Sequence, residues 1–303
     1  MKNSFVKFIF SICSFFVLLI VADRIVARLE NKLFASNDHK INYALYGKES
    51  TDILILGSSR ASHHYVPQML SDSLGMKCIN LGTDGQGIFY NYSLFHLYTK
   101  HHTPKIVIYE LSSFDWEAEK GNMYGRLDAL STIYGKDEFV DSIIAKSSPS
   151  FKIVTSIFNS FCFNGKIHNA LINTHQTSNK AGYLPLKGER PIDLPIKTSE
   201  ITEVPQIEPV KMAYMKQLIS ECKQKGITFI LAISPSLLRS DGDIIQQVAN
   251  ELCGDAIPFL NYLNSTNDMS LYKDNTHMNS KGAEWYTTQI INDLRQILAE
   301  CEF

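Results

Sequence analysis

The hydrophobic positions of this chain follow two patterns, which change near residue 50. Before that point, residues 8–22 are almost purely apolar, and counted from Phe5 the run approaches the roughly 20 residues that cross a bilayer as a helix. After it, apolar runs of strand length alternate with longer amphipathic segments. Strands that alternate with helices predict a parallel sheet with helices on both of its faces.

The alternation defines the expected elements. Strands are predicted over 52–56, 77–81, 105–111, 227–233 and 256–260, and helices over 67–74, 87–100, 210–225, 241–252 and 280–298. The predicted fold class is therefore α/β. We expect a three-layer α/β/α domain over residues 51–303, with a parallel five-stranded sheet of flavodoxin-like type.

One long segment interrupts this alternation. Residues 116–205 have mixed polarity and little clean periodicity, and prolines at 185, 191, 195 and 205 oppose regular helix in its last part. We expect an insertion with a few helices and a long loop, and long loops in compact domains are usually functional.

The apolar N-terminus allows three interpretations: a buried core helix, a cleaved signal peptide or an uncleaved signal anchor. A core helix at the extreme terminus would show a polar face. Cleavage after Ala22 would place Ile20 where a small residue is needed. The pattern therefore favours a transmembrane signal anchor over 1–23, followed by a juxtamembrane helix and linker over 24–50.

The charges that flank the anchor give weak support for its orientation. Lys2 and Lys7 precede the apolar run, whereas Arg24, Arg28 and Lys32 follow it. We expect the N-terminus to lie inside and the bulk of the single-pass protein to lie outside the cytoplasm.

Composition excludes some classes of function. A net charge of -2 and a pI of about 6.5 do not fit a general nucleic-acid-binding protein, which would carry a basic stripe. The six cysteines contain no Cys-x-x-Cys pair, so a zinc or redox motif is not indicated. We expect no metal and no organic cofactor.

The first segment with candidate chemistry is 57–60, Gly-Ser-Ser-Arg, at the end of the first strand of the domain. A serine at a strand-to-helix turn can present its hydroxyl and its backbone N–H on the same side, as acyl transfer requires. The alternative is an ordinary turn and helix cap. Arg60 is either a contact for an anionic substrate or a salt-bridge partner at the helix start.

The second segment is Asp274-Asn275-Thr276-His277, just before the last predicted helix. Side chains three residues apart can meet, so Asp274 can orient the imidazole of His277 toward a serine. The alternative is capping by an Asp-rich loop.

The third segment is the glycine-rich run 80–87, which follows the second strand. Gly85 lets the backbone approach a ligand closely, and its N–H could complete an oxyanion hole. A phosphate-binding turn is the rival interpretation, although the spacing is not the dinucleotide fingerprint and no Walker lysine is present.

Together these segments resemble the SGNH/GDSL-like hydrolase superfamily, over about residues 50–300. The resemblance implies that Ser59 is the nucleophile, with Ser58 where aspartate often stands. It implies that Gly85 and Ser59 supply oxyanion donors and that Asp274 and His277 form the relay. The trailing Asn279 and Gly282 also resemble that family.

The chain departs from the family pattern after the third strand. Phe114 stands where an asparagine oxyanion donor is expected. Loss of one such donor can cost about 10²–10³ in rate. Either Ser112 or Ser113 substitutes, or the N–H groups of Ser59 and Gly85 act alone, or the protein is weakly active. Both serines are also possible substrate contacts, like Ser58 and Arg60.

The implied activity is that of a serine esterase or O-acyltransferase acting on acyl esters of a cell-surface glycan, within the envelope polysaccharide machinery. The insertion would form part of the substrate cleft. The alternatives are a catalytically weak or inactive glycan-binding protein with the same fold and a membrane-tethered cytoplasmic thioesterase. Two adjacent histidine pairs, 63–64 and 101–102, are interpreted as surface residues, and Ser234 as part of a turn.

Overall fold

The computed structural model describes residues 2–36, 40–116, 126–164, 181–196, 206–238, 241–254 and 257–300. The chain divides into two compact units. One contains Met1–His39 and Tyr124–Thr177, and the other contains Lys40–Met123 and Ser178–Phe303.

The larger unit is built on a five-stranded sheet in which every neighbouring pair of strands is parallel. The strands are β1 (Ile53–Gly57), β2 (Cys78–Asn80), β3 (Ile106–Glu110), β4 (Thr228–Ile233) and β5 (Phe259–Asn261), in the order β2-β1-β3-β4-β5. Every residue of β1 and β3 is buried. Such uninterrupted burial is typical of parallel strands covered on both faces.

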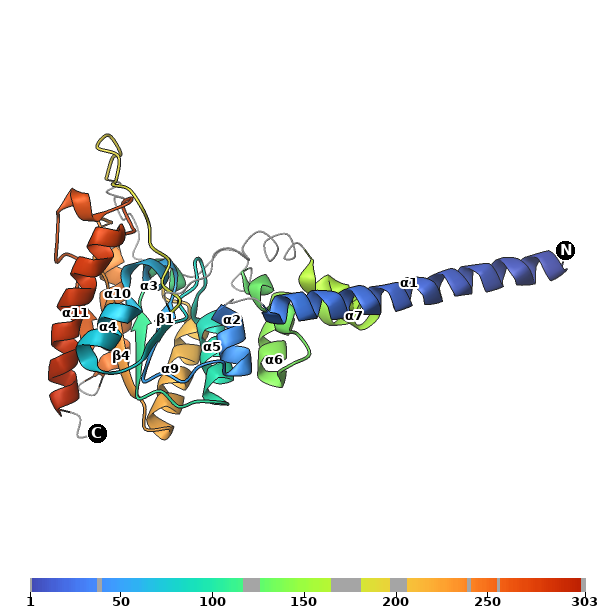
Figure 1. The fold of residues 1–303 in the computed structure, drawn as a ribbon, viewed down its shortest axis with the longest axis horizontal. Helices are drawn as coiled ribbons and strands as arrows, with labels where there is room; N and C mark the ends of the chain where they lie inside the picture. Colours follow the sequence, from blue (N-terminus) through green and yellow to red (C-terminus); the bar gives the residue numbers. More distant parts are fainter. Residues whose placement is uncertain are drawn as a thin grey trace. The chain divides into compact units, whose positions relative to one another are not determined.

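One face of the sheet is covered by α3 (Ser59–His64), α4 (Pro67–Leu74) and α11 (Ser280–Glu300) (Figure 1). Alternate strand residues such as Ile55 and Ile108 share a core with Leu70 and Tyr286 on these helices. Leu70, Ile55 and Ile108 are fully buried, so this core fixes the short helix α3 directly above the sheet.

The opposite side carries α2 (Lys40–Tyr46), α5 (Ile88–Thr99), α9 (Pro209–Gln224) and α10 (Asp241–Cys253). Helix α5 packs on both α2 and α9, and α9 packs on β4. Lys216 of α9 pairs with Glu251 of α10 at 2.6 Å. The unit therefore has three layers, as predicted, and the α/β fold class is confirmed.

The element boundaries agree closely with the hydrophobic pattern. Helix α4 matches its predicted bounds, and the other predicted helices are shifted by a residue or two. Strand β5 begins at Phe259 rather than at 256, a residue that lies outside the described part of the chain. Helix α3 has six residues and no amphipathic repeat, so the pattern did not reveal it.

The smaller unit contains α1 (Lys2–Ser36), α6 (Glu138–Ser147), α7 (Phe151–Ile157) and the 3₁₀ helices η2 (Leu127–Ile133) and η3 (Asn159–Phe163). Residues Asn3–Ala35 are long and apolar enough to cross a membrane, with a mean hydropathy of 2.6. The large side chains from Phe5 to Val21 are exposed. The predicted N-terminal membrane helix is thus present as a helix, continuous into the predicted linker.

Packing on α1 begins at Asp23. Its carboxylate accepts hydrogen bonds from the backbone N–H groups of Asn159 and Ser160, at 2.8 and 3.1 Å. Further along, the ring of Phe34 packs edge-on against Phe163 at 6.3 Å between centroids. Before Asp23 the apolar side chains of α1 are therefore exposed, whereas after it one face of the helix is packed and Ile25, Val26 and Leu29 remain exposed.

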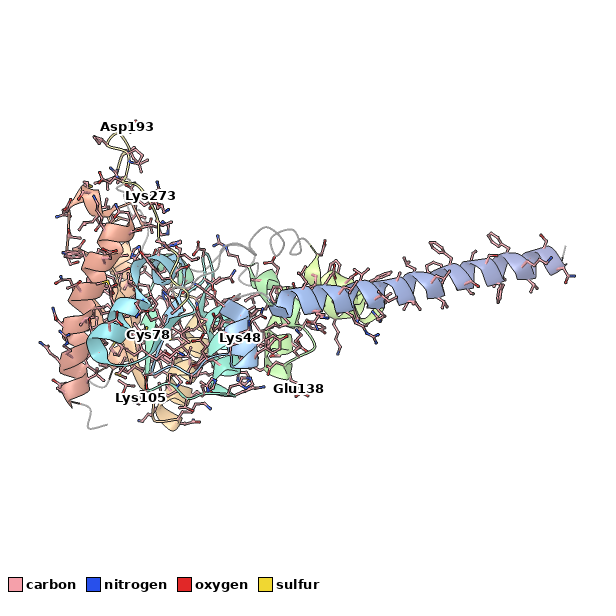
Figure 2. All side chains as sticks on the ribbon, in the orientation of Figure 1. Lys48, Cys78, Lys105, Glu138, Asp193 and Lys273 are labelled. Carbon is pink, nitrogen blue, oxygen red and sulfur yellow. The ribbon has the colours of Figure 1, made fainter. Side chains whose placement is uncertain are left out.

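The carboxyl ends of the strands define the edge where chemistry is expected. Figure 2 labels Lys105, which precedes β3, and Lys273, on the loop before α11, at opposite ends of the larger unit. Asp193, in the segment 181–196, lies at the same end as Lys273 (Figure 2).

We predict that Gly282→Ala lowers stability although alanine normally favours a helix. An added Cβ would lie 2.1 Å from the Leu271 carbonyl oxygen, so η5 (Met269–Leu271) would have to move away from α11. Overpacking of this kind costs about 1–3 kcal/mol. The unfolding temperature of the full chain in detergent measures it. Glu284→Ala, an exposed site two residues on, should change stability by less than about 0.5 kcal/mol.

Candidate active site

The nucleophile candidate Ser59 is positioned by a turn that only glycine permits. Gly57 ends β1 with a φ of 139°, and a Cβ there would lie 2.8 Å from the Glu110 carbonyl oxygen. The Gly57 N–H donates to Asn91 Oδ1 at 3.0 Å. The chain then turns sharply, and Ser59 becomes the first residue of α3.

Ser59, His277 and Asp274 form a connected relay. Ser59 Oγ lies 2.7 Å from His277 Nε2, and His277 Nδ1 lies 3.0 Å from Asp274 Oδ2. A carboxylate can only accept, so Nδ1 carries the proton and Nε2 is left to accept the hydroxyl proton of Ser59. This is the arrangement that activates a serine as a nucleophile.

Asp274 also shapes the loop that carries His277. Its Oδ1 accepts the backbone N–H groups of Thr276 and His277, both at 2.8 Å. Partial burial acts to raise the pKa of Asp274, but the hydrogen bonds from the His277 ring and from these N–H groups lower the pKa to about 2. Asp274 therefore remains a carboxylate across the physiological range.

The glycine-rich segment after β2 lies against the nucleophile turn. The Thr83 N–H donates to the Gly57 carbonyl at 3.0 Å, and the Asn80 side chain donates to the Ala61 carbonyl at 2.6 Å. Gly82 is packed so closely that a Cβ would lie 2.4 Å from Ala61 Cβ. Gly85 has a φ of 69°. The structure thus brings the first and third sequence segments together, while oxyanion donation by Ser59 and Gly85 stays a prediction.

Asn91 was not identified from the sequence, although it joins both segments. Its Oδ1 accepts the Gly57 N–H, and its Nδ2 donates to the Gly87 carbonyl at 2.9 Å. Asn91 is fully buried in α5. The only signal in the sequence was a polar asparagine within a largely apolar predicted helix, because a buried polar side chain needs hydrogen-bond partners.

The segment after β3 braces the start of α5. Asp115 accepts the Ile88 N–H at 3.2 Å and the Tyr109 hydroxyl at 3.1 Å. Ser112 is buried. Ser113 is half-buried and begins η1 (Ser113–Asp115). The Phe114 side chain lies outside the described part of the chain.

Arg60 and Ser58 lie inside the protein. The Arg60 side chain is 2% exposed, pairs with Glu110 at 3.3 Å and donates to the Leu111 carbonyl. Of its two predicted roles, the structure shows the salt bridge. Ser58 is buried next to the nucleophile, and no partner of its hydroxyl is found among the described residues.

Glu110, the last residue of β3, accepts hydrogen bonds from several elements at the carboxyl edge of the sheet. It accepts the Tyr65 hydroxyl at 2.5 Å, the Ser234 hydroxyl at 2.6 Å and the Ser234 N–H at 2.9 Å. Burial raises the pKa of Glu110, whereas Arg60 and these donors act in the opposite direction. Four donors around one carboxyl group are consistent with the ionised form.

The prediction that His63 and His64 are surface residues is wrong. Both are buried, because α3 turns back over the sheet. His63 Nδ1 donates to the Leu184 carbonyl at 2.6 Å, and Nε2 faces Asp84 Oδ2 at 3.1 Å. Their spacing from Ser59 was the missed signal, since residues four and five positions along a short helix stay close to its start.

The segment 181–196, from the predicted insertion, runs along the site. Leu184 donates its N–H to the Ser62 carbonyl at 3.0 Å, and the Leu186 carbonyl accepts the Ser280 N–H at 2.8 Å. Arg190 Nε donates to Asn275 Oδ1 at 2.7 Å. The segment thus contacts both α3 and the loop that carries His277.

Within the described residues, no group of three or more His, Cys, Asp or Glu side chains is arranged to hold a metal ion. Cys13, Cys78, Cys162, Cys222 and Cys253 are free thiols.

Comparison with known proteins gives matches of structure only. No family model matches the chain, and no curated protein matches it. Similar solved structures include a GDSL-like lipase from Bacteroides thetaiotaomicron, at 11% identity and a TM-score of 0.40, over 82% of this chain and 90% of that one. A candidate acylhydrolase from Bacteroides fragilis has 14% identity and a TM-score of 0.39, over 80% and 86% of the two chains.

An acetyl xylan esterase from Butyrivibrio proteoclasticus has 9% identity and a TM-score of 0.37, over 83% of this chain and 65% of that one. Similarity at this level does not assign an activity, which has to be inferred from the geometry of the site.

We predict that Glu110→Gln destabilises the larger unit strongly. The substitution leaves the buried Arg60 guanidinium without its counter-charge, and breaking a buried pair costs about 3–5 kcal/mol. Chemical unfolding of the full chain in detergent measures the change. Glu251→Gln breaks an ion pair of exposed side chains and should cost less than about 1 kcal/mol. Equal effects of the two substitutions would contradict the assigned role of Glu110.

Proposed function

We propose that the protein is a serine ester hydrolase or O-acyltransferase that uses Ser59, His277 and Asp274. The observation that carries this proposal is the 2.7 Å contact between Ser59 Oγ and His277 Nε2, with Asp274 on the other ring nitrogen. A protein that only binds a glycan has no need of this relay, and the contact already has the reach of a general base.

In the proposed reaction, Ser59 Oγ attacks the carbonyl carbon of an ester while His277 Nε2 takes the hydroxyl proton. The ester C–O bond then breaks, and the imidazolium returns the proton to the leaving alcohol. Asp274, still ionised, stabilises the imidazolium and holds its ring in place. The product of this half-reaction is an acyl-Ser59 intermediate.

The second half-reaction needs an acceptor hydroxyl. Water gives an esterase, and a sugar hydroxyl gives an O-acyltransferase. In both cases His277 Nε2 removes the acceptor's proton while the acceptor oxygen attacks the acyl carbon. The bond between this carbon and Ser59 Oγ then breaks, and the imidazolium returns the proton to Ser59 Oγ. The backbone N–H groups of Ser59 and Gly85 are proposed to hold the oxyanion in both steps. This proposal is supported by the hydrogen bond from the Thr83 N–H to the Gly57 carbonyl, which holds the glycine-rich segment against the nucleophile turn.

The substrate is proposed to be an acyl ester of a cell-surface glycan, handled by envelope polysaccharide machinery. The support is the N-terminal helix, whose exposed apolar part ahead of Asp23 is roughly 20 residues, or about 30 Å long. We propose that this part spans the membrane once and that the catalytic unit faces away from the cytoplasm.

We predict that a fluorophosphonate probe labels the full chain in detergent and that Ser59→Ala abolishes labelling. His277→Ala should slow labelling by about 10⁴-fold or more, because the serine loses its base. The label is read by gel fluorescence. Ser73→Ala, an exposed serine on α4, is the matched control and should label like wild type.

Absence of labelling in well-folded wild type would contradict the enzyme proposal and favour the glycan-binding alternative. Labelling that persists in Ser59→Ala would show that another residue is modified and would remove Ser59 from the role of nucleophile.

We predict that a C-terminal alkaline phosphatase fusion is active in intact cells, because its disulfides form only outside the cytoplasm. A C-terminal β-galactosidase fusion, which works only inside, should be inactive. The opposite pair of results would place the catalytic unit in the cytoplasm and support the thioesterase alternative.

A further inference from the structure

Helix α3 carries the nucleophile and also a fully buried histidine, His64, that the mechanism above does not use. His64 lies five residues after Ser59, or about 7.5 Å along α3, and it is fully buried. Its Nε2 accepts the backbone N–H of Met278 at 2.9 Å. Met278 directly follows the catalytic base, so this contact holds the chain at the residue next to His277.

The other nitrogen of His64 determines its protonation. Since Nε2 accepts from Met278, Nδ1 carries the proton and donates to Ser234 Oγ at 2.7 Å. Ser234 in turn donates its own hydroxyl proton to Glu110. In this series of hydrogen bonds every donor faces an acceptor. The series ends on the Glu110 carboxylate, which also pairs with Arg60.

The neutral ring is the only form that fits. A protonated His64 would direct an N–H at the Met278 N–H, and a buried donor facing a donor is costly. Burial lowers the pKa of His64 well below its usual value, and His277 and Arg60 act in the same direction. His64 therefore is not a second general base; both of its nitrogens are already occupied.

The helix is fixed at its far end as well. Thr287 of α11 donates to the His64 carbonyl at 3.3 Å and accepts the Val66 N–H at 3.0 Å. The rings of His64 and His277 approach edge-on at 6.3 Å between centroids. The element that carries Ser59 thus also contacts the segment that carries His277.

We propose that His64 is a positioning residue, which sets the separation of Ser59 Oγ and His277 Nε2 by holding the Met278 backbone N–H against α3. This inference rests on the proposed function. Its physical consequence is that the nucleophile and its base share one rigid support. A displacement of about 1 Å in such a relay can cost about 10² in rate.

Two substitutions at His64 separate its contacts. Glutamine reaches about as far as Nε2 and can still accept from Met278. Asparagine reaches only as far as Nδ1, so it can keep the hydrogen bond to Ser234 Oγ but loses the one from the Met278 N–H. We expect His64→Asn to slow fluorophosphonate labelling of Ser59 about 10²-fold, and His64→Gln to stay within about tenfold of wild type.

Hydrolysis of p-nitrophenyl acetate gives a second readout. His64→Asn should lower kcat with KM nearly unchanged, because the substrate contacts remain, and His64→Gln should restore kcat. His101→Asn makes the same exchange at an exposed histidine and should behave like wild type. Thermal unfolding accompanies each measurement.

The outcomes distinguish the two proposals. Labelling that depends on Ser59 but is equally fast in His64→Asn would overturn the positioning role alone. Labelling that does not depend on Ser59 would overturn the proposed function and the positioning role with it. If His64→Asn does not fold, Ser234→Ala, which removes the acceptor for Nδ1, takes its place. It should slow labelling about tenfold, and an unchanged rate would overturn the proposal.

Discussion

The buried carboxylate of Glu110 is the group on which the arrangement of this site depends. It ends β3. It pairs with Arg60 of α3 and accepts hydrogen bonds from Tyr65, directly after α3, and from Ser234, directly after β4. Two elements far apart in sequence are thereby joined at one buried point. Because burial raises the pKa of this carboxyl group, its charge is stable only while these donors remain in place. The relay can therefore be aligned only where these groups surround Glu110.

The relay itself is assembled from segments that follow strands, as expected at the carboxyl edge of a parallel sheet. Ser59 follows β1, the glycine-rich segment follows β2, and the loop of His277 leads into α11. Two glycines make the close approaches possible: Gly57 at the nucleophile turn, and Gly82 where the loop meets α3. A side chain at either position would separate the segments whose contact the proposed chemistry needs.

Much of the fold could be predicted from the sequence because buried parallel strands and amphipathic helices leave regular patterns. The Asp274–His277 pair could be predicted because its members are neighbours along the chain. The contact of His64 with Met278, 214 positions away, and that of Asn91 with Gly57, 34 positions away, could not be predicted, because the partners are distant in sequence. An adjacent histidine pair on an unrecognised six-residue helix gave no reason to expect burial. Arg60 could be assigned to one of its two roles only when Glu110 was seen beside it.

The contacts of Asp23 have a consequence for the proposed insertion of α1 into a membrane. As the proposed membrane helix, α1 would have to draw an ionised carboxylate into hydrocarbon in order to slide toward the cytoplasmic side, at a cost of about 2.5–3.5 kcal/mol even by the lowest scales. It would also have to release Asp23 from the N–H groups of Asn159 and Ser160. In the proposed topology, Asp23 would therefore limit how far α1 can move into the bilayer. With α1 inserted as proposed, the smaller unit would lie at a fixed height at the bilayer surface.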